Sequence, residues 1–128
     1  MQDPEETKQP TKSFRDLNVW QDAHKFVLNV YEVSAGFPDH ERYCLTSQFR
    51  RAAISVPANI AEGYRRTSAQ EKVRFLNISE GSLEECRYYC ILCRDLGYPQ
   101  PEDWENALNK VGGQLAVYKQ KIRQSIVK

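Results

Sequence analysis

The hydrophobic residues of this chain recur at intervals of three and four, which is the spacing of amphipathic helices. The pattern predicts an all-α protein with four helices, over residues 18–36, about 46–62, 68–96 and from 101 onward. Residues 1–13 are polar and contain two prolines, so we expect a disordered leader there. The prediction is therefore a single four-helix-bundle domain over residues 14–128.

Short sequence signals mark the ends of the predicted helices. Asn18 with Gln21, and Ser68 with Glu71, have the spacing of capping boxes. Gly97 lies where the third helix is expected to end.

Proline and glycine predict irregularities in two helices. Pro57 lies inside the second helix, removes one backbone donor and predicts a kink. Gly63 is expected to end that helix, with residues 64–67 as the connection. In the fourth helix the pair Gly112 and Gly113 predicts either a close approach or a bend.

Each predicted helix has an apolar face, and the third has two. The second helix has one stripe, formed by Leu45, Phe49, Ala52, Val56 and Ile60. One stripe of the third helix can serve the bundle: Val73, Leu76, Leu83, Cys86, Cys90 and Cys93. The other needs a further neighbour: Phe75, Ile78, Tyr89, Leu92 and Leu96. The fourth helix alternates steps of four and three, which predicts left-handed packing at about +20°, through Trp104, Leu108, Val111, Leu115, Tyr118 and Ile122.

The second helix also carries a wholly polar stripe, centred about 110° around the helix axis from its apolar stripe. Its members are Gln48, Arg51, Ser55, Asn59 and Glu62. A stripe in that position lies at the flank of the core, where a neighbouring helix or another subunit should cover it. Buried polar groups must be paired. We therefore predict a polar seam in which Asn59 and Glu62 are largely buried, with Arg51 or Gln48 among their partners.

Composition favours a cytoplasmic protein. No apolar run approaches the ~20 residues that a membrane helix needs, and the polar, acidic start of the chain is not a signal peptide. Three of the four cysteines are crowded into one segment, which is not the spacing of a secreted disulfide framework.

The sequence offers no combination of residues that predicts catalysis. The spacing of Cys86, Cys90 and Cys93 is that of a radical-SAM iron–sulfur motif, but on a helix it places all three on one apolar face, where free cysteine acts as a small hydrophobe. A di-iron bundle needs Glu-x-x-His motifs, and neither His24 nor His40 has Glu three residues before it. A Gly-rich phosphate loop is also missing. We expect no enzyme activity, metal, cofactor or small-molecule substrate.

Charge is segregated along the chain although the net charge is only +1. Residues 1–41 carry four basic and eight acidic side chains, and residues 42–74 carry seven and two. Residues 75–109 carry two and seven, and residues 110–128 carry five and none. This alternation fits neighbouring helices or subunits that meet through complementary faces, and it also fits solvated faces with no partner.

Five basic residues, expected around the turn between the second and third helices, are candidates for nucleic-acid contacts: Arg50, Arg65, Arg66, Lys72 and Arg74. The alternative is that they form solvated faces or ion pairs between subunits. Aromatic residues that could stack on bases are few and scattered.

Residues 14–98 resemble a known family, the small four-helix-bundle proteins encoded within intervening sequences of bacterial large-subunit ribosomal RNA genes. The resemblance is most specific at Ser55, Pro57 and Asn59–Gly63. It also rests on Phe14, Leu17, Val19, Trp20, Ala23, Phe37, Pro38, Glu41, Leu45, Gln48, Arg51, Ala52, Phe75, Leu76, Gly81–Leu83 and Glu85. Ser79 departs from the family's usual alanine and adds a hydroxyl to a packed face.

The resemblance implies an up-down-up-down, left-handed bundle that assembles into a homopentameric ring, in a family without an established enzyme activity. A distant branch with a similar fold, the accessory proteins of diversity-generating retroelements, works with RNA and a reverse transcriptase. Two hypotheses follow. The first is a non-catalytic oligomeric scaffold with an unknown partner, and the alternative is an accessory factor that binds RNA or nucleoprotein.

Overall fold

The computed structural model describes residues 11–127, and within that range the regular structure is entirely helical. The long helices are α1 (Asn18–Ser34), α2 (Leu45–Arg65), α3 (Ala69–Leu96) and α4 (Trp104–Val127). Two 3-10 turns, η2 (Phe14–Asp16) and η3 (Asp39–Glu41), precede α1 and α2. The prediction of an all-α protein with four helices is confirmed.

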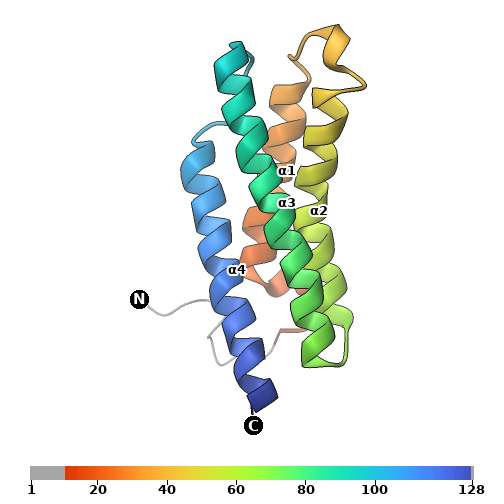
Figure 1. The fold of residues 1–128 in the computed structure, drawn as a ribbon. Helices are drawn as coiled ribbons and strands as arrows, with labels where there is room; N and C mark the ends of the chain where they lie inside the picture. Colours follow the sequence, from red (N-terminus) through yellow and green to blue (C-terminus); the bar gives the residue numbers. More distant parts are fainter. Residues whose placement is uncertain (1–10, 128) are drawn as a thin grey trace.

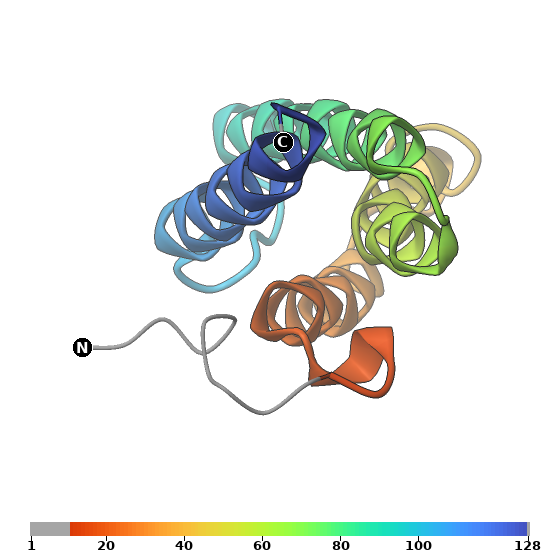
Figure 2. The same ribbon diagram turned by 90° about the horizontal axis from the view of Figure 1, so that it is seen from below.

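The four helices lie side by side, and Figure 1 shows their connections at alternating ends of the molecule. Viewed along the helices in Figure 2, the order around the molecule follows the order in the chain. Among the four contacts between neighbouring helices, that between α2 and α3 is the most extensive and that between α1 and α4 is the least. No helix in the described range is both long enough and apolar enough to span a membrane.

The start of α1 differs from the prediction. Asn18 is the first residue of the helix and not its cap, because η2 precedes it and leaves Leu17 in the N-cap position. Gln21 does not close a capping box there but donates from Nε2 to the carbonyl oxygen of Arg15, 2.7 Å away. The capping box lies one element earlier, where Ser13 and Asp16 close η2.

The predicted leader lies almost wholly outside the described residues, because residues 1–10 are not described. Its last part, residues 11–13, is bonded to the rest of the chain. The hydroxyl groups of Thr11 and Tyr64 are 2.7 Å apart, and the backbone N–H of Lys12 donates to the Asp16 carboxylate at 2.7 Å. We call residues 11–16 the N-terminal strap, since they connect α1 to the end of α2.

Gly63 does not end α2, as the sequence predicted, but lies buried inside it. A Cβ atom at this position would be 3.1 Å from Cβ of Phe75 and 3.4 Å from the carbonyl oxygen of Lys72. Both atoms are fixed to the backbone of α3, so a larger residue would require the two helices to move apart by a few tenths of an ångström. The helix continues past Gly63 to Arg65. Pro57 is also buried within α2, and its kink stays a prediction.

The boundaries of α3 agree with the sequence. The Ser68 hydroxyl accepts a hydrogen bond from the backbone N–H of Glu71 at 3.1 Å, and Gly97 follows the helix with φ +74°. That left-handed conformation is the usual one for a glycine after a helix. In α4, Gly112 permits a close approach, because its missing Cβ would be 3.3 Å from Cδ2 of Leu83; the predicted bend stays a prediction.

The core consists of the predicted apolar stripes. All five members of the α2 stripe are buried, as are the first four members of the α4 stripe. On α3 the bundle-facing stripe is buried from Leu76 onward, including all three of its cysteines. Burial of these side chains is the main source of stability.

Two hydroxyl groups of α3 connect it to α2. Ser79 is fully buried and donates to the carbonyl oxygen of Val56 at 2.8 Å. Ser82 donates to the Ser55 hydroxyl, also at 2.8 Å. Because these side chains are small, the helices pack closely and the polar groups still find partners. The hydroxyl that distinguishes Ser79 from the family's usual alanine is therefore satisfied.

The basic α4 segment meets acidic residues of both neighbours. On α1, Asp22 accepts from Nε2 of Gln114 at 3.0 Å and lies 3.4 Å from Nζ of Lys110. On α3, Glu80 is paired with Lys119. The complementary charges that the sequence predicted thus meet across the α1–α4 and α3–α4 contacts.

Gly63→Ala should lower the free energy of unfolding by about 1–2 kcal/mol, because the new methyl group overpacks the α2–α3 contact. Gly81→Ala is the matched control. Gly81 is exposed in the middle of α3 and nothing lies within 4 Å of a Cβ there, so this change should raise stability by about 0.5–1 kcal/mol. Urea denaturation followed by circular dichroism measures both. Equal stabilisation by the two substitutions would show that the close approach at Gly63 is not needed.

Candidate functional site

The polar stripe of α2 is only partly covered within one chain. Ser55 and Asn59 are half-buried at its centre, beside α3, whereas Gln48, Arg51 and Glu62 are exposed. Nδ2 of Asn59 donates to the carbonyl oxygen of Ser55 at 2.8 Å and to its hydroxyl at 2.9 Å. With Ser82, these residues form a short polar bridge between α2 and α3.

Within the chain, the hydrogen-bond partner of Asn59 is Ser55, whereas the sequence predicted Arg51 or Gln48. That prediction is wrong for the single chain. Eight residues along a helix span about 12 Å, so Asn59 cannot reach Arg51 on the same helix. Glu62 is exposed and pairs with Arg66 one turn later, at 2.6 Å. The single chain therefore does not bury the whole stripe.

The second apolar stripe of α3 lies beside this polar stripe. None of its five members is fully buried, and the exposed fractions of Ile78 and Leu96 are 41% and 49%. Ser82 joins Ser55 between the two stripes, and the Arg66 guanidinium lies 4.8 Å from the Phe75 ring centroid. We call the two stripes together the α2–α3 flank. It combines half-exposed apolar side chains with polar groups that have few partners in the chain.

Two of the five residues predicted to contact nucleic acid, Arg50 and Lys72, bind polar groups at the ends of helices. Nε of Arg50 donates to the Ser34 hydroxyl at 2.7 Å, Nη2 donates to the Tyr31 carbonyl oxygen at 3.4 Å, and the guanidinium lies 4.6 Å from the Tyr31 ring centroid. Nζ of Lys72 donates to the carbonyl oxygens of Gly63 at 3.3 Å and Tyr64 at 2.9 Å. These cations satisfy carbonyl groups at the C-terminal ends of α1 and α2. Burial lowers the pKa of Lys72.

Two other candidates share the Phe75 ring. The guanidinium of Arg74 lies 4.6 Å from the ring centroid, and Arg66 lies over the same ring. Arg74 is also paired with Glu71 at 2.7 Å, as Arg66 is with Glu62. The fifth candidate, Arg65, is exposed, and no ion pair of its side chain is found within residues 11–127. The structure thus places Arg65, Arg66, Lys72 and Arg74 at the end of the bundle where α2 connects to α3, and Arg50 near the opposite end, where α1 ends. Four of the five residues are occupied by contacts inside the chain.

The three clustered thiols are buried in the bundle. Cys86, Cys90 and Cys93 are fully buried, and burial raises the pKa of all three, to about 12 for Cys86 and about 11 for Cys93. Metal ligation and nucleophilic attack both require the thiolate. These residues are therefore neutral and act as small core residues, and no other His, Cys, Asp or Glu group in the described range is arranged to hold a metal.

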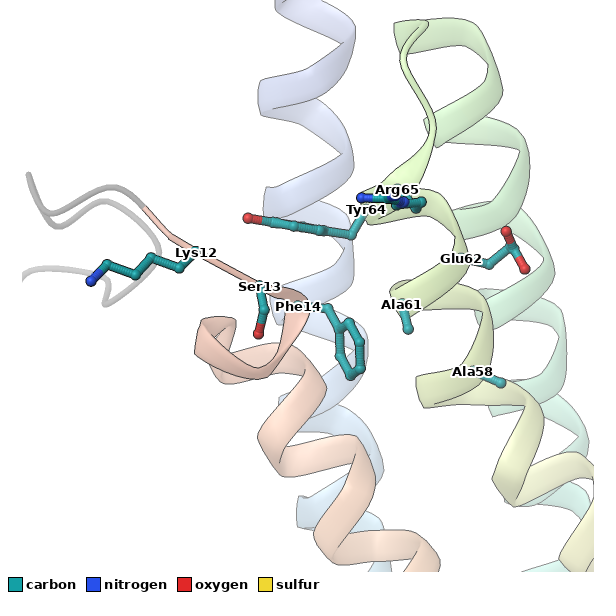
Figure 3. Close-up of a pocket in the computed structure, with 8 residues that line it drawn as sticks. All are labelled: Lys12, Ser13, Phe14, Ala58, Ala61, Glu62, Tyr64 and Arg65. Carbon is teal, nitrogen blue, oxygen red and sulfur yellow. The ribbon is translucent and has the colours of Figure 1, made fainter.

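A cavity of about 530 Å³ lies between the N-terminal strap and the last turns of α2. Figure 3 shows the Phe14 ring reaching toward α2 from the strap, and the Tyr64 ring reaching from α2 toward the strap. The lining residues are Lys12, Ser13, Phe14, Ala58, Ala61, Glu62, Tyr64 and Arg65. Sequence reasoning found only Arg65 and Glu62 among these, because the strap and the end of α2 are about fifty residues apart in the chain and no periodic signal connects them.

The thiols generate a direct prediction. At pH 8, Ellman's reagent should react rapidly with one thiol per folded chain, the exposed Cys44, and with all four in denaturant. Cys44→Ser should remove the rapid phase. Two or more rapidly reacting thiols in the folded protein would contradict the burial of the cluster.

Comparison with known proteins places the chain in a family. Residues 15–116, well over half of the chain, match the family model described as 23S rRNA-intervening sequence protein. A search of curated proteins found no match. The matched segment includes α1, α2, α3 and the first half of α4, and with them the polar stripe and most of the cavity. The chain belongs to the 23S rRNA-intervening sequence protein family.

Proposed function

We propose that the protein is a non-catalytic, cytoplasmic scaffold whose up-down-up-down, left-handed bundle assembles into a homopentameric ring. The observation that carries this proposal is the α2–α3 flank. A half-exposed apolar stripe there runs beside polar groups that the chain covers only at Ser55 and Asn59. Covering this flank would bury apolar area and supply partners for Gln48 and Arg51.

A second copy of this chain is the partner that fits the flank best. The flank and its margins carry both charges, since Arg66 and Arg74 are paired with Glu62 and Glu71 and Arg51 lies about three turns earlier on α2. Two mixed surfaces of this kind can pair charges with each other and still join their apolar parts. A ring of five subunits is what the family resemblance implies, and the ring contact is heterologous, so that each subunit also offers a different face to its other neighbour.

The RNA-binding alternative receives less support from the side-chain contacts. Four of its five candidate residues bind carbonyl groups, hydroxyls, carboxylates or aromatic rings within the chain, and Arg65 alone of these residues is left for a phosphate. Phosphate affinity grows with the number of charges that are engaged. We therefore retain the scaffold as the proposed function and treat RNA retention as an outcome to be measured.

Light scattering coupled to gel filtration tests the assembly. The parent protein should have five times the mass of one chain at micromolar concentration, and Ile78→Lys should shift it toward the monomer, because a charge would then be buried in the flank. Tyr43→Lys is the matched control: it adds the same charge at an exposed aromatic residue between α1 and α2. A stable monomeric parent would rule out the scaffold, and a stable oligomer of another size would rule out the pentamer.

The alternative makes its own prediction. If the basic residues bind RNA, affinity should fall by about one log unit per log unit of salt for each phosphate neutralised. Replacing Arg65, which is not a member of the α2–α3 flank, by Gln should reduce that slope without changing the oligomer. Filter retention of single-stranded and structured RNA at about 50 mM salt, where counterion release favours binding, is the measurement. No retention under these conditions would exclude the RNA-binding function.

A further inference from the structure

The cavity beneath the N-terminal strap has the size and walls of a small-molecule site. Its volume of about 530 Å³ falls within the range of roughly 300–1,000 Å³ typical of such sites. The apolar wall consists of the Phe14 ring and the methyl groups of Ala58 and Ala61, and the Tyr64 ring adds a second aromatic surface. Two aromatic rings with a methyl-lined wall between them suit a flat, apolar ligand body.

The arrangement of the cavity is fixed by contacts outside it. The Thr11–Tyr64 hydrogen bond joins the strap to α2 at 2.7 Å. The Phe14 ring packs edge-on against Trp20 of α1, with 5.0 Å between their centroids, and Nζ of Lys72 lies 5.6 Å from the Tyr64 ring centroid. The two aromatic walls are therefore held in place before any ligand arrives, which reduces the entropic cost of binding.

The charges around the cavity favour an anion. Glu62, an acidic lining residue, is directed away from the Phe14 ring in Figure 3 and is paired with Arg66 at 2.6 Å. The nearby Asp16 carboxylate accepts from the backbone N–H groups of Lys12 and Ser13. In the part of the chain that the structure describes, the Arg65 side chain has no ion-pair partner.

The C-terminal end of α2 does not repel an anion in the cavity. A helix C-terminus carries a partial negative charge because its last carbonyl groups are unpaired. Here Lys72 binds the carbonyl oxygens of Gly63 and Tyr64. The backbone N–H of Arg66 also donates to the carbonyl oxygen of Gly63, at 3.2 Å. Arg65 on the cavity wall is thus not needed to neutralise the helix end.

We propose that this cavity binds a small anion with a flat, apolar body. The flat body lies between the Phe14 and Tyr64 rings against the two alanine methyl groups, and Arg65 binds the anionic group. An aromatic carboxylate and a nucleoside monophosphate share this chemistry. The proposal does not rest on the scaffold function, since all of the cavity's walls come from one chain. Glu62, one of its lining residues, also belongs to the α2–α3 flank.

Isothermal titration calorimetry of the full chain with two probes, indole-3-carboxylate and adenosine monophosphate, tests the site. At least one probe should bind saturably with one site per chain, and the tighter one identifies the kind of anion. The neutral indole-3-carboxamide should bind at least about tenfold more weakly than the carboxylate, because it forms no charge-assisted hydrogen bond with Arg65. Saturable binding of neither probe at millimolar concentration would overturn the proposal.

Paired variants locate the binding. Arg65→Gln should raise the Kd of the tighter probe by about tenfold, the loss expected for one hydrogen bond to a charged group. Arg42→Gln removes the same charge from an exposed position at the other end of α2 and should leave the Kd unchanged. Equal effects of the two variants, or no effect of either, would show that the anion binds elsewhere or without a defined site.

A steric variant checks the wall without changing charge. Ala58→Leu should fill the cavity and weaken binding at least as much as Arg65→Gln, and because Ala58 is exposed the fold should tolerate the larger side chain. Unchanged affinity in a folded Ala58→Leu protein would contradict this placement. Light scattering of each variant separates this test from that of the scaffold, because loss of binding with an unchanged oligomer concerns the cavity alone.

Discussion

The close approach of α2 and α3 is the contact on which the rest of the molecule depends. It needs a glycine at position 63, where a Cβ atom would be 3.1 Å from that of Phe75, and small hydroxyl side chains at Ser79 and Ser82. Because the helices are so close, the outer sides of both form one continuous surface. The polar stripe of α2 and the second apolar stripe of α3 therefore become a single flank instead of two separate helix faces.

Much of the positive charge of α2 and α3 serves the fold. Arg50 holds the end of α1 and Lys72 holds the end of α2, each through carbonyl groups that the helix itself cannot pair. Arg66 and Arg74 neutralise neighbouring carboxylates and cover the Phe75 ring. The excess of basic residues in this segment is thus largely explained by structure. This is why clustered charge in a sequence is weak support for nucleic-acid binding.

The sequence predicted what depends on periodicity and could not predict what depends on tertiary contact. The α2 stripe from Leu45 to Ile60 is buried as expected, since a helical period determines which side faces a core. Gly63 was misassigned as a helix end, because a glycine required by a neighbouring helix has the same local sequence signal as a terminating one. The prediction of Asn18 as the N-cap of α1 was wrong, because η2 precedes α1 and puts Leu17 in that position. The cavity could not be predicted, since Phe14 and Tyr64 meet only after the chain has folded.

Photo-cross-linking from position 78 tests most directly whether the α2–α3 flank is the surface through which subunits assemble. A photoreactive amino acid in place of Ile78, which is 41% exposed in the single chain, would be activated in the native protein and the products mapped by mass spectrometry. The account predicts cross-links to a different subunit, on one defined segment of its surface. Reaction with water or with the same chain alone would contradict it.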